Sequence, residues 1–549
     1  MSFLRFYQKE QEREPVHDPN LTLTRSDLVQ EINSKKHIDI LVVGGGIHGA
    51  AFARVSALHG LRVLLLERSD YGFETSSRSS RMAHGGLRYL ETLDLKQIIE
   101  GVRAREELLR MAPHLAKPQE FFLPVFENET FLRHKLSWGL KFYDLLVAKS
   151  QRHSWHTGWP YRAVTPPSLR SVQGGFLYFD GLMNDARIVL ENILAARQEG
   201  AHCLNYANVE SMTEQKDGSM RVGWRDRLSG KSHEIIAGAV INCAGAWAPQ
   251  VGRLRRSELA SDLCFSRGVH LIFKKAWSGP AMLRYSRKGE GHYFIWPHIA
   301  GTMLGPSENE VECAQSDPLP QPSEVDELIA RVALDFPEFE LNRSSLHYAY
   351  AGVRTMVRRG RRKDARDLSR RHEWVFDGRM LTLMGGKFTT AAHTSQEGFE
   401  RLVRMSGAKI TLGRLQDRPL PGAGPDLSKT LAMFEERAAE KGIPAAVCQR
   451  VIAQLGARLR FFAEEADFEL IGGQLLAGEL RLAFELDQAE TLDDLLRRRL
   501  QIDWNEDYGE AALEGIIRYL ARYKPNLKIE QELNARQERL EKLRALLIS

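Results

Sequence analysis

The sequence predicts an α/β protein with a Rossmann-like dinucleotide-binding domain, a mainly antiparallel second sheet and a C-terminal helical domain. An apolar strand at 38–43 runs into a glycine-rich turn and then into a helix, which is typical of a βαβ unit. Alternating apolar stretches in the middle of the chain indicate further strands, and charge-patterned helical segments follow residue 425. The length of 549 residues allows three or four structural units at about 150 residues each.

The composition excludes several classes of protein. With 43% hydrophobic and 27% charged residues, the chain is neither disordered, collagen-like nor a disulfide miniprotein. The 76 basic and 71 acidic side chains give a net charge of +5, too weak a bias for a nucleic-acid binder. A mildly basic surface does suit an anionic substrate or an anionic membrane.

The cysteines and the apolar runs indicate the compartment. The five cysteines form no C-x-x-C pair, so we expect neither a disulfide nor a metal site. The first 20 residues lack the apolar core of a signal peptide, and no apolar run approaches the roughly 18 residues of a membrane span. We expect a cytoplasmic protein whose membrane contact, if any, is peripheral, on the cytoplasmic face of the inner membrane.

Helices and strands follow one another clearly along the chain. Helices are predicted at 92–115, 131–149 and 185–197, and strands at 61–66 and 203–209. The alternating stretches 220–224, 240–243 and 269–273 are assigned to the second sheet. A proline- and glycine-rich linker at 421–425 precedes helices at 430–441, 445–455, 475–484, 492–500, 509–522 and 528–546.

The turn after the first strand carries the dinucleotide pattern Gly44-x-Gly46-x-x-Gly49. Gly44 permits the tight turn, Gly46 lets a pyrophosphate approach the backbone, and Gly49 lets helix and strand pack closely. Glu67 ends the second strand, where a carboxylate accepts ribose hydroxyls. The pattern alone does not separate FAD from NAD.

Residues 75–90 (TSSRSSRMAHGGLRYL) are dense in hydroxyls and glycines, which suit a diphosphate and a flat ring lying on backbone. At this point the chain resembles the FAD-dependent glycerol-3-phosphate dehydrogenases, flavoproteins of the D-amino-acid-oxidase-like class. The resemblance continues at 179–190, 240–247, 267–270, 350–354 and 384–390, and in the helices of 475–500.

The resemblance implies a noncovalent FAD and a division into lobes. It implies an N-terminal arm at 1–35, a two-lobed oxidoreductase domain at 36–415 and a C-terminal helical domain at 425–549. The FAD part takes about 36–90, 180–250 and 345–415, and the substrate part about 91–180 and 250–345. The cofactor contacts it implies are Gly44, Gly45, Gly46, Ile47, His48, Gly49, Glu67, Arg68, Thr75, Ser76, Ser77, His84, Gly85, Gly86, Leu87, Val209, Ala244, Gly245, Gly385, Gly386, Lys387 and Thr389.

The resemblance also supplies candidates for the chemistry. Gly385 and Gly386 precede a helix, whose N-terminus stabilises negative charge on reduced flavin. Arginine and lysine suit a phosphate, and histidine suits a proton acceptor, although a lone histidine is more often structural. Substrate contacts are assigned to Arg88, Tyr89, Arg354 and Arg370, with Arg371 as the alternative to Arg370. Catalytic roles are assigned to His270, His84, Arg354 and Lys387, and the basic run 358–363 is expected to be a solvated loop.

The implied reaction is oxidation of sn-glycerol 3-phosphate to dihydroxyacetone phosphate, with hydride passing to flavin N5 and electrons onward to a quinone. Oxygen as acceptor, another polyol phosphate or a 2-hydroxy acid as substrate, and a catalytically silent flavoprotein stay open as alternatives. The chain departs from the family at Pro306-Ser307-Glu308 and at Thr355, near the expected substrate pocket. The amphipathic helix 131–149 is either a packing helix or an interfacial one. No metal and no nucleic acid are expected, and a homodimer is left open.

Overall fold

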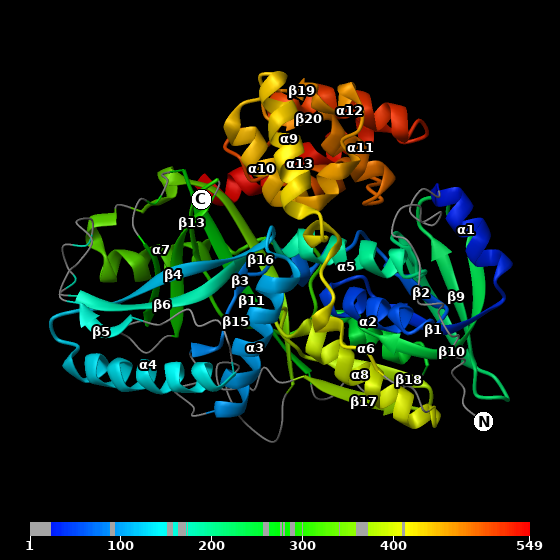
Figure 1. Ribbon diagram of the computed structural model, residues 1–549, viewed down its shortest axis with the longest axis horizontal. Coiled ribbons are helices and arrows are strands. Elements are labelled where there is room, and N and C mark those ends of the chain that lie inside the picture. Colours follow the sequence, from blue (N-terminus) through cyan, green and yellow to red (C-terminus); the bar gives the residue numbers. More distant parts are fainter. Residues whose placement is uncertain are drawn as a thin grey trace.

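Two sheets lie side by side and the C-terminal helices lie across one end of both in the computed structural model (Figure 1). The structure describes residues 24–87, 94–150, 158–162, 169, 172, 174–255, 263–274, 277, 280–285, 291–298, 300–339, 341–357, 372–408 and 412–548. Arg88, Tyr89, Arg370 and the basic run 358–363 lie outside these residues.

The first sheet is the predicted Rossmann-type sheet, with strand order β17-β18-β10-β1-β2-β7. Its parallel strands are β1 (His37–Val43), β2 (Val63–Leu66), β7 (His202–Leu204), β10 (Ser232–Asn242) and β18 (Met380–Met384). The antiparallel strands β17 (Glu373–Asp377), β8 (Ala207–Glu214) and β9 (Met220–Asp226) extend it. The βαβ unit expected at 38–67 is confirmed.

Alternate residues of β1 point to opposite faces of this sheet, and both faces are buried. Ile40 and Val42 pack against α2 (Ile47–Leu58), α5 (Asp185–Gln198) and α8 (Ala391–Ser406). Leu41 and Val43 pack on the opposite face with α1 (Arg25–Ser34) and strands β8 and β9. The near-continuous apolar run of β1 follows from this two-sided burial.

The second sheet is mainly antiparallel, as predicted. Its order is β15-β11-β14-β13-β12-β4-β6-β3, with β16 paired to β11 and β5 paired to β6. The helices α3 (Leu95–Met111), α4 (Thr130–Ser150) and α7 (Pro322–Asp335) belong to this lobe. The strands are β3 (Met82–Ala83), β4 (Ala116–Val125), β5 (Gly158–Arg162), β6 (Gly174–Met183), β11 (Leu263–Phe273), β12 (Ala281–Tyr285), β13 (His292–His298), β14 (Gly301–Gly305), β15 (Asn309–Val311) and β16 (Leu346–Val357).

Strand membership departs from the sequence prediction in three places. The stretches 220–224 and 240–243 lie in β9 and β10 of the first sheet, and only 269–273 lies in the second. The strand β16, from the range 345–415 assigned to the FAD part, pairs with β11 over nearly its whole length, and the short β3 also joins the second sheet. Alternation marks a half-buried strand but does not say which sheet completes its pairing.

The C-terminal region is helical, as expected. It contains α9 (Leu427–Glu440), α10 (Ala445–Leu455), α11 (Ala477–Glu485), a π-helical turn at Asp494–Arg499, α12 (Glu510–Tyr523) and α13 (Ile529–Ile548). Leu540, Leu543, Leu546 and Leu547 of α13 return to the core of the antiparallel sheet. The region therefore shares a core with the rest of the protein.

The two flanking segments are also packed. Thr24 caps α1 by accepting from the Asp27 N–H, and Leu28 and Ile32 bury that helix in the core, so this part of the expected arm is docked. In the linker, a Cβ on Gly422 would lie 2.2 Å from His114 Nε2, so the backbone there is tightly enclosed. Within the described residues, no helix is long and apolar enough to cross a membrane.

Candidate active site

A cavity of about 440 Å³ opens between the two sheets. The first sheet contributes the β1–α2 turn, the end of β2 and the turn after β18. The second sheet contributes β11, β13 and β16. The cavity thus begins at the carboxyl ends of the parallel strands, which is where α/β sheets bind nucleotides.

The glycine turn has the geometry that its sequence predicts. Gly44 has φ +104°, and a Cβ there would lie 2.7 Å from the Cys243 carbonyl oxygen. A Cβ on Gly49 would lie 1.9 Å from the Gly44 oxygen, so only glycine allows this close packing. A Cβ on Gly46 would meet only Ser76 Oγ, at 3.1 Å, which leaves the turn open for a phosphate to approach.

Glu67 braces this turn from the end of β2. Its Oε2 accepts the Gly45 N–H at 2.6 Å and its Oε1 accepts the Ser69 N–H at 2.8 Å. Burial raises the pKa of Glu67 above its ordinary value, against the opposing effect of these two bonds. Since Glu67 also lines the cavity, it both fixes the turn and presents a carboxylate to the cavity.

Further groups complete a cradle for a dinucleotide with a flat ring. Arg68 lies over the Trp247 ring at 3.9 Å, and both side chains line the end of the cavity near Glu67. Thr75 and Ser76 also line the cavity, and Ser76 Oγ accepts the Ile47 N–H at 3.1 Å. His48 Nε2 is buried without a hydrogen-bond partner among the described residues, and burial lowers the pKa of His48 to about 3. The hydroxyls of Thr75 and Ser76, the neutral His48 and the backbone amides of the glycine turn together form a set of groups that fits FAD.

Asp180, on β6, also lines the cavity. Its Oδ1 accepts the Gly85 N–H at 2.6 Å and pairs with Arg105 Nη1 at 3.1 Å. Burial raises the pKa of Asp180 to about 6, although Arg105 opposes the shift. The carboxyl thereby fixes the Gly85–Gly86 turn, of which Gly86 (φ +82°) lines the cavity.

Two cations from different elements line the cavity. Arg354 of β16 lies across Gly268 of β11, so that a Cβ on Gly268 would be 2.6 Å from Arg354 Nη2. Glu308 Oε1 lies 3.8 Å from Arg354 Nη1. Lys387, in the turn between β18 and α8, donates from Nζ to Gln97 Oε1 at 2.5 Å. Arg354, Lys387 and His84 all line the same cavity.

His270 lies behind the wall of the cavity. Its side chain is 1% exposed, stacks on Tyr350 at 4.9 Å and bonds through Nε2 to Ser80 Oγ at 2.9 Å. Burial, and secondarily Arg354, hold the pKa of His270 well below its ordinary value. Ser80 lines the cavity and His270 does not, so His84 is the better-placed proton acceptor of the two.

Most predicted cofactor contacts line the cavity. Gly45, Gly49, Ser77 and Gly85 do not, since they shape the turns from behind. The predicted contacts that do are Gly44, Gly46, Ile47, His48, Glu67, Arg68, Thr75, Ser76, His84, Gly86, Leu87, Val209, Ala244, Gly245, Gly385, Gly386, Lys387 and Thr389.

Several lining residues were not predicted. Trp247 and Gln250 follow the Ala244–Gly245 turn, so adjacency was an available signal. Arg78, Ser79 and Ser80 belong to the hydroxyl-rich segment but were not singled out. Asp180 lies in the stretch 179–190 that resembles the family but was not singled out, whereas His292 and Phe294 come from β13 of the second sheet and no local motif marks them.

Comparison with known proteins agrees with this geometry. The profile of the family described as FAD dependent oxidoreductase (DAO) matches residues 39–390. The chain is 27% identical to the aerobic glycerol-3-phosphate dehydrogenase of Bacillus subtilis (strain 168), covering 88% of this chain and 91% of the relative. It is 28% identical to the mitochondrial glycerol-3-phosphate dehydrogenase of Homo sapiens, covering 94% and 74%.

Solved structures show the same fold. The glycerol-3-phosphate dehydrogenase from Bacillus halodurans complexed with FAD superimposes with a TM-score of 0.74 at 23% identity, covering 96% of this chain and 98% of that one. The L-alpha-glycerophosphate oxidase from Mycoplasma pneumoniae with FAD bound gives 0.51 at 16% identity, covering 70% and 99%. With the dinucleotide cradle and the family match together, the chain belongs to the FAD dependent oxidoreductase (DAO) family and uses FAD as its cofactor.

Proposed function

We propose that the protein oxidises sn-glycerol 3-phosphate to dihydroxyacetone phosphate. The observation that carries the proposal is the meeting of Arg354, Lys387 and His84 in the cavity that holds the dinucleotide cradle. Two cations suit a phosphate, and a histidine suits the proton of a secondary alcohol. The names of the relatives support the same substrate.

FAD, when bound, supplies a two-electron acceptor for the hydride of the substrate carbon. Arg354 holds the phosphate through its planar guanidinium, and Lys387 adds a point charge. His84 accepts the hydroxyl proton as the carbon–hydrogen bond breaks. Arg88, Tyr89 and Arg370 remain proposed additional contacts.

The departures from the family bear on the same pocket. Pro306 and Thr355 line the cavity, and Glu308 approaches Arg354. Glu308 places a carboxylate beside the proposed phosphate site, so it affects the size and the hydrogen bonding of the pocket. Glycerol 3-phosphate ranks ahead of larger polyol phosphates and of 2-hydroxy acids because the relatives are named for it.

The experiment is a comparison of kcat/KM with a dye acceptor for glycerol 3-phosphate, glycerol and a 2-hydroxy acid such as lactate. Two charge-assisted contacts are worth about 3 kcal/mol or more, so glycerol 3-phosphate should exceed glycerol by at least about 100-fold. Equal use of glycerol, or a preference for lactate, contradicts the proposed substrate.

For the acceptor we propose a membrane quinone, reached through the outer face of α4. Three large apolar side chains of this helix are exposed: Phe131 at 83%, Trp138 at 72% and Phe142 at 38%. Lys141 Nζ lies 5.1 Å from the Trp138 ring, and Arg133 and Lys135 are also exposed. Aromatic and basic side chains on one helix suit the interface of an anionic bilayer.

The test is sedimentation with anionic vesicles. The variant F131S/W138S should lose most vesicle binding while keeping its turnover with a dye acceptor. The matched control M433S removes another exposed apolar side chain (55%), on α9, and should bind as wild type does. Undiminished vesicle binding of F131S/W138S contradicts the helix assignment. Peroxide formed at the rate of turnover in air, without quinone reduction, favours an oxidase.

A further inference from the structure

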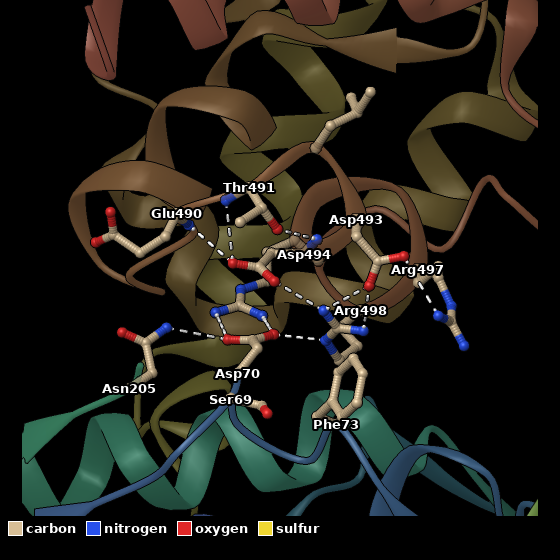
Figure 2. Close-up of polar contacts among 12 residues, drawn as sticks. Ser69, Asp70, Phe73, Asn205, Glu490, Thr491, Asp493, Asp494, Arg497 and Arg498 are labelled. Carbon is tan, nitrogen blue, oxygen red and sulfur yellow. Dashed lines mark hydrogen bonds and ion pairs between the residues drawn. The ribbon is translucent and has the colours of Figure 1, made fainter. Parts of the chain in front are cut away.

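The π-helical turn Asp494–Arg499 of the C-terminal region meets the loop that follows β2 (Figure 2). Arg498 Nε donates to Asp70 Oδ2 at 2.5 Å, and Arg499 Nη2 donates to Asp70 Oδ1 at 2.8 Å. Arg499 Nη1 also contacts Oδ2, and Asn205 Nδ2 donates to Oδ1 at 3.1 Å. Asp70 is 0% exposed and the two arginines are 1% and 2% exposed.

The charges in this contact are matched. Arg498 also pairs with Asp494 at 2.7 Å and with Asp493 at 3.0 Å. Although burial alone would raise it, Arg499 and Arg498 hold the pKa of Asp70 below its ordinary value. An ion pair this deeply buried depends on both partners, because loss of one leaves an uncompensated charge.

The same loop is tied to the FAD turn on its other side. The Gly72 N–H donates to the Gly45 carbonyl oxygen at 3.0 Å. A Cβ on Gly45 would lie 2.8 Å from Tyr71 Cδ1, and the Tyr71 hydroxyl donates to Gln488 of the C-terminal region at 2.7 Å. Asp70 and the Tyr71 hydroxyl therefore contact the C-terminal region, while Gly72 and the Tyr71 ring contact the glycine turn.

The neighbouring arginines reach the cavity wall as well. Arg498 lies over the ring of Phe73 at 5.2 Å, and Phe73 lines the cavity. Arg497 pairs with Asp317 at 3.1 Å, and Asp317 in turn pairs with Arg78, another lining residue. Three consecutive arginines of one turn thus each support a segment of the FAD site from behind. π-Helical turns are frequent at functional sites.

We propose that Arg498 and Arg499, with Arg497 beside them, are positioning residues for FAD. By clamping Asp70 they fix the loop 69–73, and through Gly72 and Phe73 they fix the glycine turn and the cavity wall. The C-terminal region then contributes to cofactor affinity without contacting the cofactor. This inference does not depend on the substrate, so it survives or fails separately from the proposed reaction.

The first test is the FAD dissociation constant of R498K and R499K, measured by the quenching of FAD fluorescence on adding deflavinated protein. Lysine keeps the charge but not the two-pronged contact, so we expect at least about a tenfold weaker affinity. The matched control is R450K, an arginine of the C-terminal region that holds Glu479 in a two-pronged contact at 2.6 and 2.7 Å. It should bind FAD within about threefold of wild type. Wild-type affinity in R498K and R499K, or an equal loss in R450K, overturns the proposal.

The second test needs no variant and decides the matter if the lysine variants do not fold. Coupling is reciprocal, so FAD must stabilise the contact that stabilises FAD binding. On addition of FAD to deflavinated wild-type protein, the amides of 69–73 and 494–499 should gain hydrogen-exchange protection together, while those of α9 (427–440) stay unchanged. Protection confined to the cavity-lining segments, with 494–499 unaffected, overturns the proposal.

Discussion

A single methyl group at Gly268 tests the role of Arg354. Gly268 lies in β11 opposite Gly352, and a Cβ there would lie 2.6 Å from Arg354 Nη2 and 2.8 Å from its Cζ. Ordinary contact begins at about 3.4 Å, so the guanidinium must retreat by at least about 0.8 Å. The three atoms nearest to the methyl all belong to this flexible side chain, so we expect the side chain rather than the strand to move.

A misplacement of about 1 Å in a substrate-positioning group costs on the order of 100-fold in rate. We therefore expect G268A to lower kcat/KM for glycerol 3-phosphate by about 10- to 100-fold, with FAD affinity and thermal midpoint close to wild type. R354A should cost at least as much. Because both changes act through one guanidinium, G268A/R354A should be no worse than R354A alone.

The control is G413A, because the Cβ at Gly413 would have no neighbour closer than 3.9 Å. It should leave kcat/KM unchanged. Wild-type activity in both G268A and R354A would show that Arg354 does not hold the substrate. Losses that add fully in the double variant would show that the methyl does not act through Arg354.

Three further predictions concern the cofactor turn, the buried carboxyl and the base. In G49A the new methyl would lie 1.9 Å from the Gly44 oxygen, so the variant should purify without FAD; a yellow G49A protein contradicts the close-packing argument. Burial raises the pKa of Asp180 from 3.8 to about 6, so the folded protein holds this proton more tightly than the unfolded chain does. The contribution of Asp180 to the free energy of unfolding is therefore complete below about pH 4, and about 3 kcal/mol of it is lost as the pH rises through 6. Urea unfolding of the deflavinated protein should show this slope and D180N should lack it; identical slopes contradict the assignment. H84N should lower kcat by about 10²- to 10⁴-fold at unchanged FAD affinity. H292N changes another cavity-lining histidine and should keep its kcat; a larger loss of kcat in H292N than in H84N would assign the base to His292 instead.

The sequence predicted the FAD end of the site better than the substrate end. The glycine turn is a local structure: the positive φ of Gly44 and the close packing of Gly49 follow from residues a few positions apart. Glu67 follows from the same βαβ unit. Such features are readable because their partners are near in sequence.

Contacts between distant segments were not readable in this way. Asp70 and Arg498 are separated by 428 positions, and no sequence pattern in either segment indicates that the two side chains contact each other. His270 was predicted as a base from its motif, but only the packing of Tyr350 and Ser80 around it shows that it lies behind the cavity wall. The range 345–415 was assigned to the FAD part, and its pairing with β11 through β16 could not be predicted because β11 is distant in sequence.

The most direct test of the account is anaerobic mixing of the purified holoenzyme with glycerol 3-phosphate, followed by its visible absorbance. The account predicts that the oxidised flavin bleaches within the time of one turnover and that one dihydroxyacetone phosphate forms per flavin. R354A should bleach far more slowly at the same substrate concentration. A flavin that stays oxidised with glycerol 3-phosphate, or bleaches as fast with glycerol, would contradict the central claim that this cavity oxidises a phosphorylated alcohol.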